Sequence, residues 1–382
     1  MIHRSGAAQG GPPGSPLGIY GDSNTIPGGR ASRRTERWSL KELQRAWTES
    51  VPSGRCGYPI GPVTVEISTA FIAHVLGIAH CGSPWSCPIC APVIRERRAQ
   101  EFNAMSQEAE RLGWCQLFGV GTVRHHMGQP LAEMLPVVTS GCSDTLQGRW
   151  WQSFKARFDY VGMIRTIEVN YGPNGWHPHW QSLMFFRRLV PESAVAEFSA
   201  WWLSRWDALC TRKGYGPLVD EGLVVEGLRS EDAIGDYLVK PAGSWGVGRE
   251  LTRGDVKRES VTFPAFDLLS PDSKWLWLEY EAATRGRRFS RCDGRLRAEL
   301  VGSEPEQSDE ELATAEGSGE VLFRISVGGD AWSFYVQAGL VGWFLEQVEW
   351  SAALVAWLLS VWGHSMPDVV VESAERKELQ SA

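Results

Sequence analysis

An α+β fold is expected for this chain, with an antiparallel sheet of the ferredoxin or RRM-like type at its centre. Strand and helix signals between residues 114 and 245 follow the order β-α-β-β-α-β and end in a further helix. That order gives an antiparallel sheet with helices on one face. Three cysteines within residues 81–90 predict a zinc-knuckle module before the sheet, and Trp-rich residues 321–363 predict a small unit after it. A length of 382 residues suits two or three such domains.

The charge of the chain is unevenly distributed. The formal net charge is -7, but residues 301–382 contain 14 acidic and only 3 basic side chains. The first 300 residues are therefore slightly basic, and the acidity of the whole does not exclude a nucleic-acid partner. The composition excludes a collagen, a coiled coil and a wholly disordered chain.

Neither end of the chain carries a membrane signal. Residues 1–29 are rich in Gly, Pro and Ser and lack the apolar core of a signal peptide. The longest uninterrupted apolar run near the other end, Ser351 to Trp362, is too short to span a bilayer. We expect a cytoplasmic protein without a membrane partner.

The sequence divides into five expected segments. The first is a disordered, basic arm, in which residues 30–47 form either a solvated helix face or a DNA-contacting helix. The segments are the arm (1–50), a zinc-binding module (51–113), the sheet domain (114–245), a basic DNA-contacting extension (246–300), and an acidic linker with a small Trp-rich C-terminal unit (301–382).

The elements of the sheet domain follow from hydrophobic periodicity and turn residues. A Gly/Pro/Asn turn separates the second and third strands, and Pro191 opens the second long helix. The expected strands are Gln116–Val123, Tyr160–Asn170, His177–Phe186 and Leu218–Val225, and the helices lie within Leu131–Phe158, Pro191–Lys213 and Ser230–Lys240.

The cysteine cluster has the spacing of a zinc knuckle. Cys87 and Cys90 form a C-x2-C pair, and Cys81 lies six residues before it. Such a pair places two thiolates at the separation that tetrahedral Zn²⁺ needs, and a closed structural site needs four ligands. Without an export signal, metal ligation is favoured over disulfides. The alternative is a set of incidental buried cysteines. The candidates for the fourth ligand are Cys56, which we favour, and then His80 and His74.

A second candidate metal site lies on the strand after the turn. Side chains alternate along a strand, so His177, His179 and Gln181 share one face. Glu168 and Asn170 can lie opposite them across the hairpin. Two imidazoles, a carboxylate and an amide form an open site for a divalent cation, which would polarise a phosphodiester oxygen. An H-x-H pair by itself is a weak motif.

A tyrosine and a lysine share one face of the last expected helix. Tyr237 and Lys240 stand at i and i+3. A free phenol has a pKa of about 10, so it is a poor nucleophile at neutral pH. A neighbouring ammonium and a divalent metal would favour the phenolate and neutralise the attacked phosphate. The alternative is an ordinary surface pair.

Residues 285–297 form a basic cluster with six arginines and one aspartate, suited to the phosphates of a nucleic acid. The arginines are Arg285, Arg287, Arg288, Arg291, Arg295 and Arg297.

Taken together, these motifs resemble those of the HUH-endonuclease replication initiators of rolling-circle plasmids, in particular the actinobacterial type. The resemblance covers roughly residues 55–300, and is carried by residues 81–90, 122–126, 175–179, 237–240, 245–251 and 279–288. It implies that the histidine pair holds Mg²⁺ or Mn²⁺. It also implies that Tyr237 nicks one strand of plasmid origin DNA at a single-stranded or cruciform site. The tyrosine then carries the 5′ phosphate, and the free 3′ hydroxyl primes replication with a host helicase and polymerase.

The chain departs from that family's pattern in three places. Its first strand motif, residues 118–122, contains glycines where the family is Thr-rich, and Gln181 stands where the family often has a third histidine. A carboxylate four residues before the nucleophile would fall on Ala233, so Asp232 and Asp236 are the nearest substitutes.

Two other functions compete with a replication initiator. Another HUH enzyme, a transposase or relaxase, is disfavoured because relaxases place their tyrosine before the histidine motif, whereas Tyr237 follows it. A transposase is disfavoured by the length and the zinc knuckle. The other alternative is a non-enzymatic, zinc-dependent DNA-binding regulator, from which Mn²⁺-dependent nicking of supercoiled plasmid would distinguish the enzyme.

Overall fold

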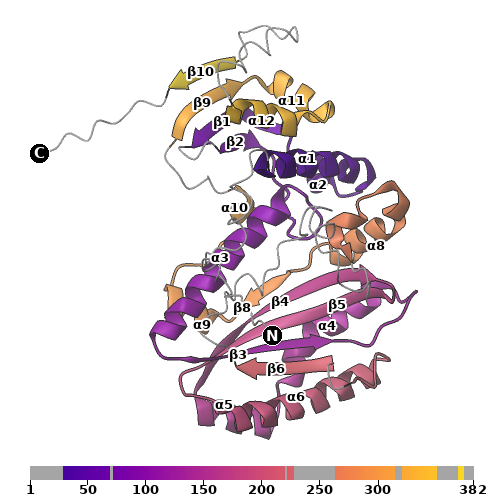
Figure 1. The fold of residues 1–382 in the computed structure, drawn as a ribbon, viewed down its shortest axis with the longest axis vertical. Coiled ribbons are helices and arrows are strands. Elements are labelled where there is room, and N and C mark those ends of the chain that lie inside the picture. Colours follow the sequence, from indigo (N-terminus) through magenta and orange to yellow (C-terminus); the bar gives the residue numbers. More distant parts are fainter. Residues whose placement is uncertain are drawn as a thin grey trace, which may run out of the picture.

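The structure is a computed structural model that describes residues 29–68, 72–219, 222–227, 263–314, 321–350 and 369–373. The expected α+β class is confirmed, since helices pack on two antiparallel sheets (Figure 1). The helices are α1 (Gly29–Trp47), α2 (Val51–Arg55), α3 (Cys90–Arg111), α4 (Leu131–Thr145), α5 (Arg149–Phe158), α6 (Glu192–Arg212), η2 (Ala265–Leu268), η3 (Pro271–Ser273), α8 (Lys274–Thr284), α9 (Gly294–Val301), α10 (Asp309–Thr314), α11 (Gly329–Gln337) and α12 (Val341–Trp350). The strands are β1 (Pro59–Ser68), β2 (Ala73–Ile78), β3 (Cys115–Thr122), β4 (Tyr160–Gly172), β5 (Gly175–Phe186), β6 (Leu223–Gly227), β7 (Phe263–Pro264), β8 (Ser290–Cys292), β9 (Val321–Val327) and β10 (Val369–Ser373).

The larger sheet is built from the central part of the chain. Its strands lie in the order β6-β3-β5-β4-β7, and β8 also pairs with β4. All of these pairs are antiparallel. The four strands expected from the sequence are present, although β6 begins at Leu223 rather than Leu218. The centre of this sheet is the β3-β5 pair, whose two strands are separated in sequence by two helices and β4.

The helix expected within residues 131–158 is two helices, α4 and α5. The break falls at residues 146–148, where Gly148 has a φ of 95°. Glycine enters this left-handed region without the steric cost that a side chain brings. The helix expected over residues 230–240 lies outside the described residues.

Aromatic packing identifies the helix-covered face of the larger sheet. Trp180 of β5 stacks on Trp202 of α6 at 4.8 Å between ring centroids and meets Trp206 edge-on at 5.7 Å. Side chains alternate along β5, so His177 and His179 face the other side. In Figure 1, α5 and α6 lie next to β6 and α8 lies next to β4.

The smaller sheet joins two segments that the sequence analysis assigned to different units. Its order is β10-β9-β1-β2, so strands of residues 59–78 pair with strands of residues 321–373. Val65 of β1 lies opposite Ile325 of β9, and both are buried with Trp332 of α11 in one apolar core. Neither pair of strands can bury its apolar face by itself. Burial of these faces therefore brings the strands of residues 321–373 against those of residues 59–78.

Helix α1 covers the residues 30–47 for which a helix was expected, but parts of it are buried rather than solvated. Trp38 and Lys41 are buried, and Arg34 pairs with Glu349 of α12 at 2.5 Å. Side chains of this helix therefore connect the smaller sheet to the cysteine cluster. They do not all face solvent.

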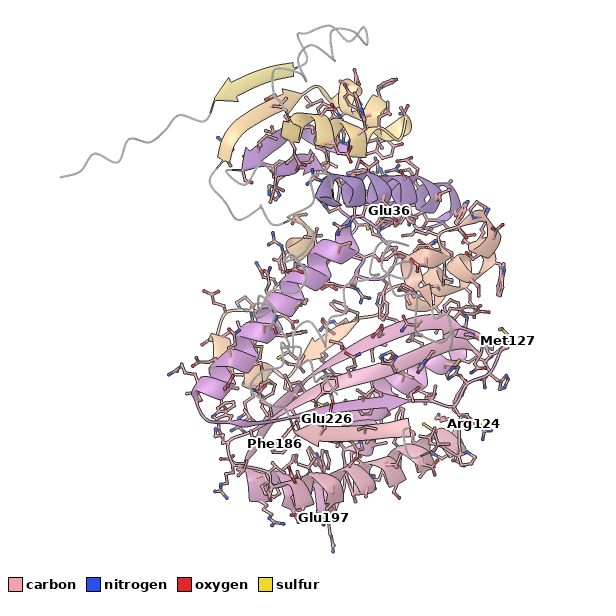
Figure 2. All side chains as sticks on the ribbon, in the orientation of Figure 1. Glu36, Arg124, Met127, Phe186, Glu197 and Glu226 are labelled. Atoms are coloured by element: carbon pink, nitrogen blue, oxygen red, sulfur yellow. The ribbon has the colours of Figure 1, made fainter. Side chains whose placement is uncertain are left out.

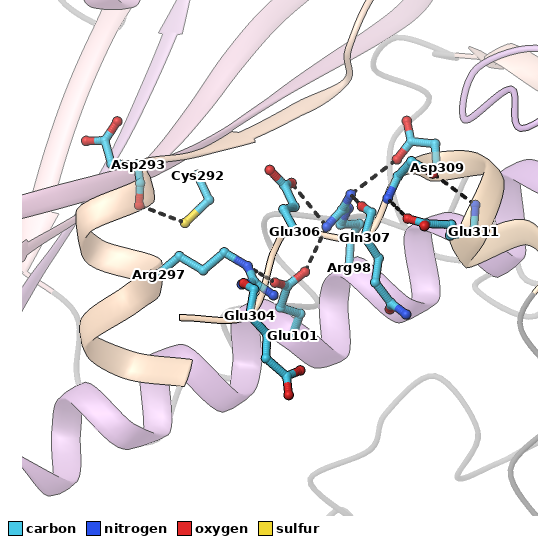
Figure 3. Close-up of polar contacts among 11 residues, drawn as sticks. Arg98, Glu101, Cys292, Asp293, Arg297, Glu304, Glu306, Gln307, Asp309 and Glu311 are labelled. Carbon is cyan, nitrogen blue, oxygen red and sulfur yellow. Dashed lines mark hydrogen bonds and ion pairs between the residues drawn. The ribbon is translucent and has the colours of Figure 1, made fainter. Parts of the chain in front are cut away.

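The acidic residues expected in a linker are partly folded onto α3. Arg98 of α3 is only 4% exposed and pairs with Glu101 at 2.9 Å and with Glu306 at 3.1 Å. Asp309, the first residue of α10, lies 3.5 Å from the same guanidinium (Figure 3). Among the described helices, none combines the length and apolar character that a membrane crossing requires.

Candidate functional site

The structure brings the four predicted cysteines together. Cys56 follows α2, Cys81 and Cys87 lie in the loop before α3, and Cys90 is the first residue of α3. The Cys56 sulfur is 3.6 Å from that of Cys87 and 3.5 Å from that of Cys90. All four sulfurs lie within 4.8 Å of one another. This donor set and spacing are compatible with a metal site, and four thiolates are the set that structural Zn²⁺ takes.

The two histidines considered as alternative ligands lie differently. His80 is adjacent, with its Nδ1 3.8 Å from the Cys90 sulfur. His74 lies on β2 opposite Glu66 and is not part of the group of converging sulfurs. The cysteines thus form the group of four without either imidazole.

A buried lysine from α1 lies against the cysteine cluster. The Lys41 ammonium donates to Gln44 Oε1 at 2.6 Å and to the Ser53 carbonyl at 2.7 Å, and lies 3.7 Å from the Cys87 sulfur. Burial opposes the charge on Lys41, but the nearby Cys87 thiolate raises the lysine pKa above its ordinary value. Burial likewise opposes ionisation of Cys87, yet contacts with Cys56, the other cysteines and Lys41 hold the pKa of its thiol well below the usual value. A cation is therefore built in beside the Cys87 thiolate, whereas the neighbouring cysteines and burial raise the pKa values of the Cys56 and Cys90 thiols.

The loop between Cys81 and Cys87 contacts the larger sheet through Trp85. The Trp85 indole donates to the Arg287 carbonyl at 2.8 Å, and its ring packs edge-on against Tyr280 and Phe289. The Phe289 carbonyl in turn accepts from the Ile167 amide of β4 at 2.7 Å. Ile167 precedes Glu168, so the cysteine cluster supports the strand that carries a candidate metal ligand.

The second candidate site lies on the β4-β5 hairpin. The register places Glu168 opposite His179 and Asn170 opposite His177. Glu168 Oε2 is 3.1 Å from His179 Nε2 and 3.2 Å from Gln181 Nε2. Asn170 donates to the other carboxylate oxygen at 3.1 Å. Glu168, His179 and Gln181 therefore converge, as the alternation of strand side chains predicted.

Two buried polar atoms at this site have no hydrogen-bond partner. They are His179 Nδ1 and Gln181 Oε1. The oxygen and nitrogen of an amide are assigned from their surroundings, and a half-turn of the Gln181 amide would point its oxygen at the converging atoms. Imidazole, carboxylate and amide oxygen are donors that suit Mg²⁺ or Mn²⁺. Within the described parts of the chain, however, only the cysteine group brings three or more His, Cys, Asp or Glu atoms within 4.8 Å of one another, so His177, His179 and Glu168 are more widely spread.

The end of β3 adds two residues that the sequence analysis did not assign to the site. Thr122 Oγ1 is 3.0 Å from His177 Nε2, and the His125 ring stacks on the His177 ring at 4.7 Å. His125 Nδ1 lies 3.1 Å from the Val123 carbonyl. Figure 2 shows Arg124 and Met127 at this end of the sheet and Phe186 at a distance along β5. The signal available in the sequence was the position of Thr122 at the end of an expected strand and of His125 shortly after it.

The glycines of β3 account for the departure from a Thr-rich strand. A Cβ atom on Gly121 would lie 2.2 Å from the Trp180 ring, and one on Gly119 would lie 3.2 Å from the Trp202 ring. Gly121 is the cross-strand neighbour of Trp180. The indoles that fill the space under α6 therefore exclude a side chain at Gly121 and leave little room for one at Gly119.

The predicted nucleophile, Tyr237, and its neighbour Lys240 lie outside the described residues. Other phenols near the site can be compared. Burial raises the pKa of Tyr280 well above its ordinary value, and its hydroxyl donates to the Trp85 carbonyl at 3.4 Å. Tyr171 is partly exposed, its hydroxyl donates to the Met127 sulfur at 3.2 Å, and partial burial raises its pKa. Tyr280 is thus engaged in the core, whereas Tyr171 is accessible.

The arginine cluster divides into two groups. Arg295 pairs with Glu299 at 3.0 Å, and Arg297 pairs with Glu101 at 2.9 Å and contacts the Glu304 carbonyl (Figure 3). Arg287 donates to the Ala283 carbonyl at 2.7 Å. The second group, Arg285, Arg288 and Arg291, is exposed and forms no ion pair among the described residues.

A cavity of about 450 Å³ lies between the cysteine loop and the arginines. Its walls include Cys81, Trp85, Arg98, Arg285 and Arg288. The cavity thus connects the cysteine cluster to the exposed cations.

Comparison with known proteins relates the chain to a Streptomyces protein. It is 28% identical over 347 residues to "Protein rep" of Streptomyces lividans, with 72% of this chain and 76% of that protein covered. It is 26% identical over 152 residues to "Neomycin resistance protein" of Streptomyces cyanogenus, with 33% of this chain and 35% of that protein covered. No protein-family model and no solved structure matches the chain. The first similarity spans most of both chains, whereas the second is confined to about a third of each.

Proposed function

We propose that the chain initiates rolling-circle replication of a plasmid by nicking one strand at the origin, and that residues 114–245 are an HUH endonuclease domain with a ferredoxin-like sheet. The observation that carries the proposal is the convergence of His179, Glu168 and Gln181 beside His177, on the face of the two longest strands opposite Trp180. The similarity to "Protein rep" supports a role in plasmid replication and binding of plasmid DNA.

Mg²⁺ or Mn²⁺ would be held by His177, His179 and Glu168, with Gln181 as a further ligand. When bound, the ion would polarise the scissile phosphodiester. Thr122 restrains the His177 ring through the contact at 3.0 Å. Partners of this kind fix ring orientation and tautomer and so prepare the imidazoles as ligands.

Tyr237 is the proposed nucleophile. Its phenolic oxygen would form a bond to the phosphorus while the bond from phosphorus to the 3′ oxygen breaks. The 3′ oxygen takes up a proton and leaves as the hydroxyl that a host polymerase extends behind a host helicase. Lys240, three residues further along the chain, would stabilise the phenolate and the phosphate.

The four cysteines would hold one structural Zn²⁺. The site then fixes the cysteine loop, and through Trp85 and Phe289 it supports β4 next to Glu168. Zinc binding of this kind is coupled to folding, so the ion would stabilise the fold rather than take part in the reaction.

Nicking of supercoiled plasmid tests the proposed activity. The substrate is a plasmid carrying the origin of the chain's own replicon, and the product is the open circle formed with Mn²⁺. We expect nicking by the unaltered protein and none by His177→Ala or His179→Ala, while both variants still bind the plasmid. Binding without nicking by the unaltered protein would instead support the non-enzymatic regulator, and full nicking by either variant would remove the histidine pair from the site.

A further inference from the structure

Helix α8 exposes a tryptophan. Trp275 is 61% exposed, whereas the other tryptophans of known exposure in the described parts of the chain are buried or half-buried. An exposed aromatic side chain points to a binding surface when further exposed apolar side chains adjoin it.

The neighbours of Trp275 on the same helix face are also exposed. Leu278 is 36% exposed, Ala282 is exposed, and Arg285 follows the last residue of the helix. Spacings of three and four residues place these side chains on one face. We call Trp275, Leu278, Ala282 and Arg285 the α8 stripe. It is about 15 Å long at the rise of an α-helix, which is long enough for a few stacked nucleotides.

The charges along the α8 stripe have one sign. From residue 274 to residue 288, the exposed charged side chains are Lys274, Arg285 and Arg288. The two arginines form no ion pair among the described residues and line the cavity next to the cysteine loop. Acidic side chains also lie nearby: Asp272 is exposed before Lys274, and Glu279 is half-buried and accepts from the Leu131 amide at 2.8 Å. Glu281, Glu306, Asp309 and Glu310 line the same cavity as the two arginines. The stripe therefore combines an exposed aromatic side chain with two exposed arginines that form no ion pair among the described residues.

Helix α8 lies next to the histidine end of the larger sheet. The Tyr280 ring, on the inner face of α8, stacks on Trp176 at 6.2 Å between centroids. Trp176 is adjacent to His177 in β5. Helix α8 therefore packs beside the end of β5 that carries His177, against a residue of the opposite strand face.

We propose that the α8 stripe binds single-stranded DNA, with a base stacked on Trp275 and the adjoining phosphates held by Arg285 and Arg288. This inference rests on the proposed nicking function, which requires an unpaired strand near His177. Base stacking on an aromatic ring combined with a positive track is the general mode of single-strand binding. The positive charge favours a phosphate backbone over an apolar protein surface as the occupant.

Fluorescence anisotropy of a labelled single-stranded oligonucleotide tests the stripe. Trp275→Ala should weaken binding by about 5- to 150-fold at every salt concentration, because the lost contact is stacking. Trp275→Phe should retain most of the affinity. Arg285→Ala should reduce the slope of log K against log salt concentration by about 0.7, because one phosphate contact is lost. The matched control is Leu189→Ala, which removes another exposed apolar side chain and should bind as the unaltered protein does.

The outcomes separate this inference from the proposed function. Folded Trp275→Ala protein that binds the oligonucleotide with unaltered affinity overturns the α8 stripe, while nicking by the same preparation leaves the function standing. A loss of self-association with unaltered DNA affinity would assign the stripe to a protein contact and would also overturn the inference. An unaltered protein that binds no single-stranded DNA contradicts both proposals.

Discussion

Replacing Lys41 with methionine tests whether α1 supports the cysteine cluster. The substitution keeps the length of the side chain and removes its charge and its donors. Gln44 Oε1 and the Ser53 carbonyl, which now accept from the ammonium at 2.6 and 2.7 Å, would be left buried without that donor. An unsatisfied buried acceptor costs about 1–3 kcal/mol, so we expect a loss of about 2–6 kcal/mol in the free energy of unfolding.

The same substitution should weaken metal binding. The Lys41 ammonium lies 3.7 Å from the Cys87 sulfur and compensates negative charge that four thiolates retain around one Zn²⁺. Loss of a supporting contact around a metal site costs about 10- to 100-fold in affinity. The assay is competition for zinc with a chromophoric chelator, accompanied by thermal unfolding. Lys213→Met, at an exposed position after α6, is the matched control. Unaltered zinc affinity and stability in Lys41→Met would refute the role that we assign to this lysine.

Three further substitutions test other parts of the account. Glu168→Ala should raise the Mn²⁺ concentration needed for nicking, because one converging ligand is removed; an unaltered requirement would exclude Glu168 from the site. Cys90→Ser should lose one zinc per chain together with the fold, and elemental analysis that finds no zinc in active unaltered protein would refute the zinc site. Gly121→Thr should lower stability by about 1–3 kcal/mol and the melting temperature by a few degrees, because a Cβ would lie 2.2 Å from Trp180. In a protein that already carries Trp180→Leu, Gly121→Thr should cost less stability than it does in the unaltered protein. An equal cost in the two backgrounds would show that the two residues do not clash.

Local patterns in the sequence predicted the elements of the larger sheet and the gathering of the cysteines. Period-two and helical hydrophobic patterns depend on neighbours a few residues apart, so β3, β4, β5 and α6 could be found without knowledge of the fold. The C-x2-C pair is equally local. Cys56 is the favoured candidate for the fourth ligand, ahead of His80 and His74, and its sulfur lies with the other three.

Contacts between distant residues were not predictable in the same way. The pairing of β1 with β9 joins Val65 to Ile325, and no local signal specifies it. The amphipathic pattern of α1 does not reveal that Lys41 points at thiols rather than solvent. Arg297 belongs to a basic run in the sequence, yet its guanidinium is engaged by Glu101 of α3. Charge clusters read from a sequence therefore overstate the cations that remain available for DNA.

The central claim is that the chain cuts DNA through a covalent tyrosine intermediate. The most direct measurement is denaturing electrophoresis of the protein after reaction with Mn²⁺ and origin DNA labelled at the scissile phosphate, followed by mass spectrometry of the labelled peptide. We predict a labelled adduct on Tyr237, and no adduct with Tyr237→Phe, although this variant keeps its stability and origin binding. An adduct that persists in Tyr237→Phe and disappears in Tyr171→Phe would assign the nucleophile to Tyr171, and the absence of any adduct from the unaltered protein would contradict the claim itself.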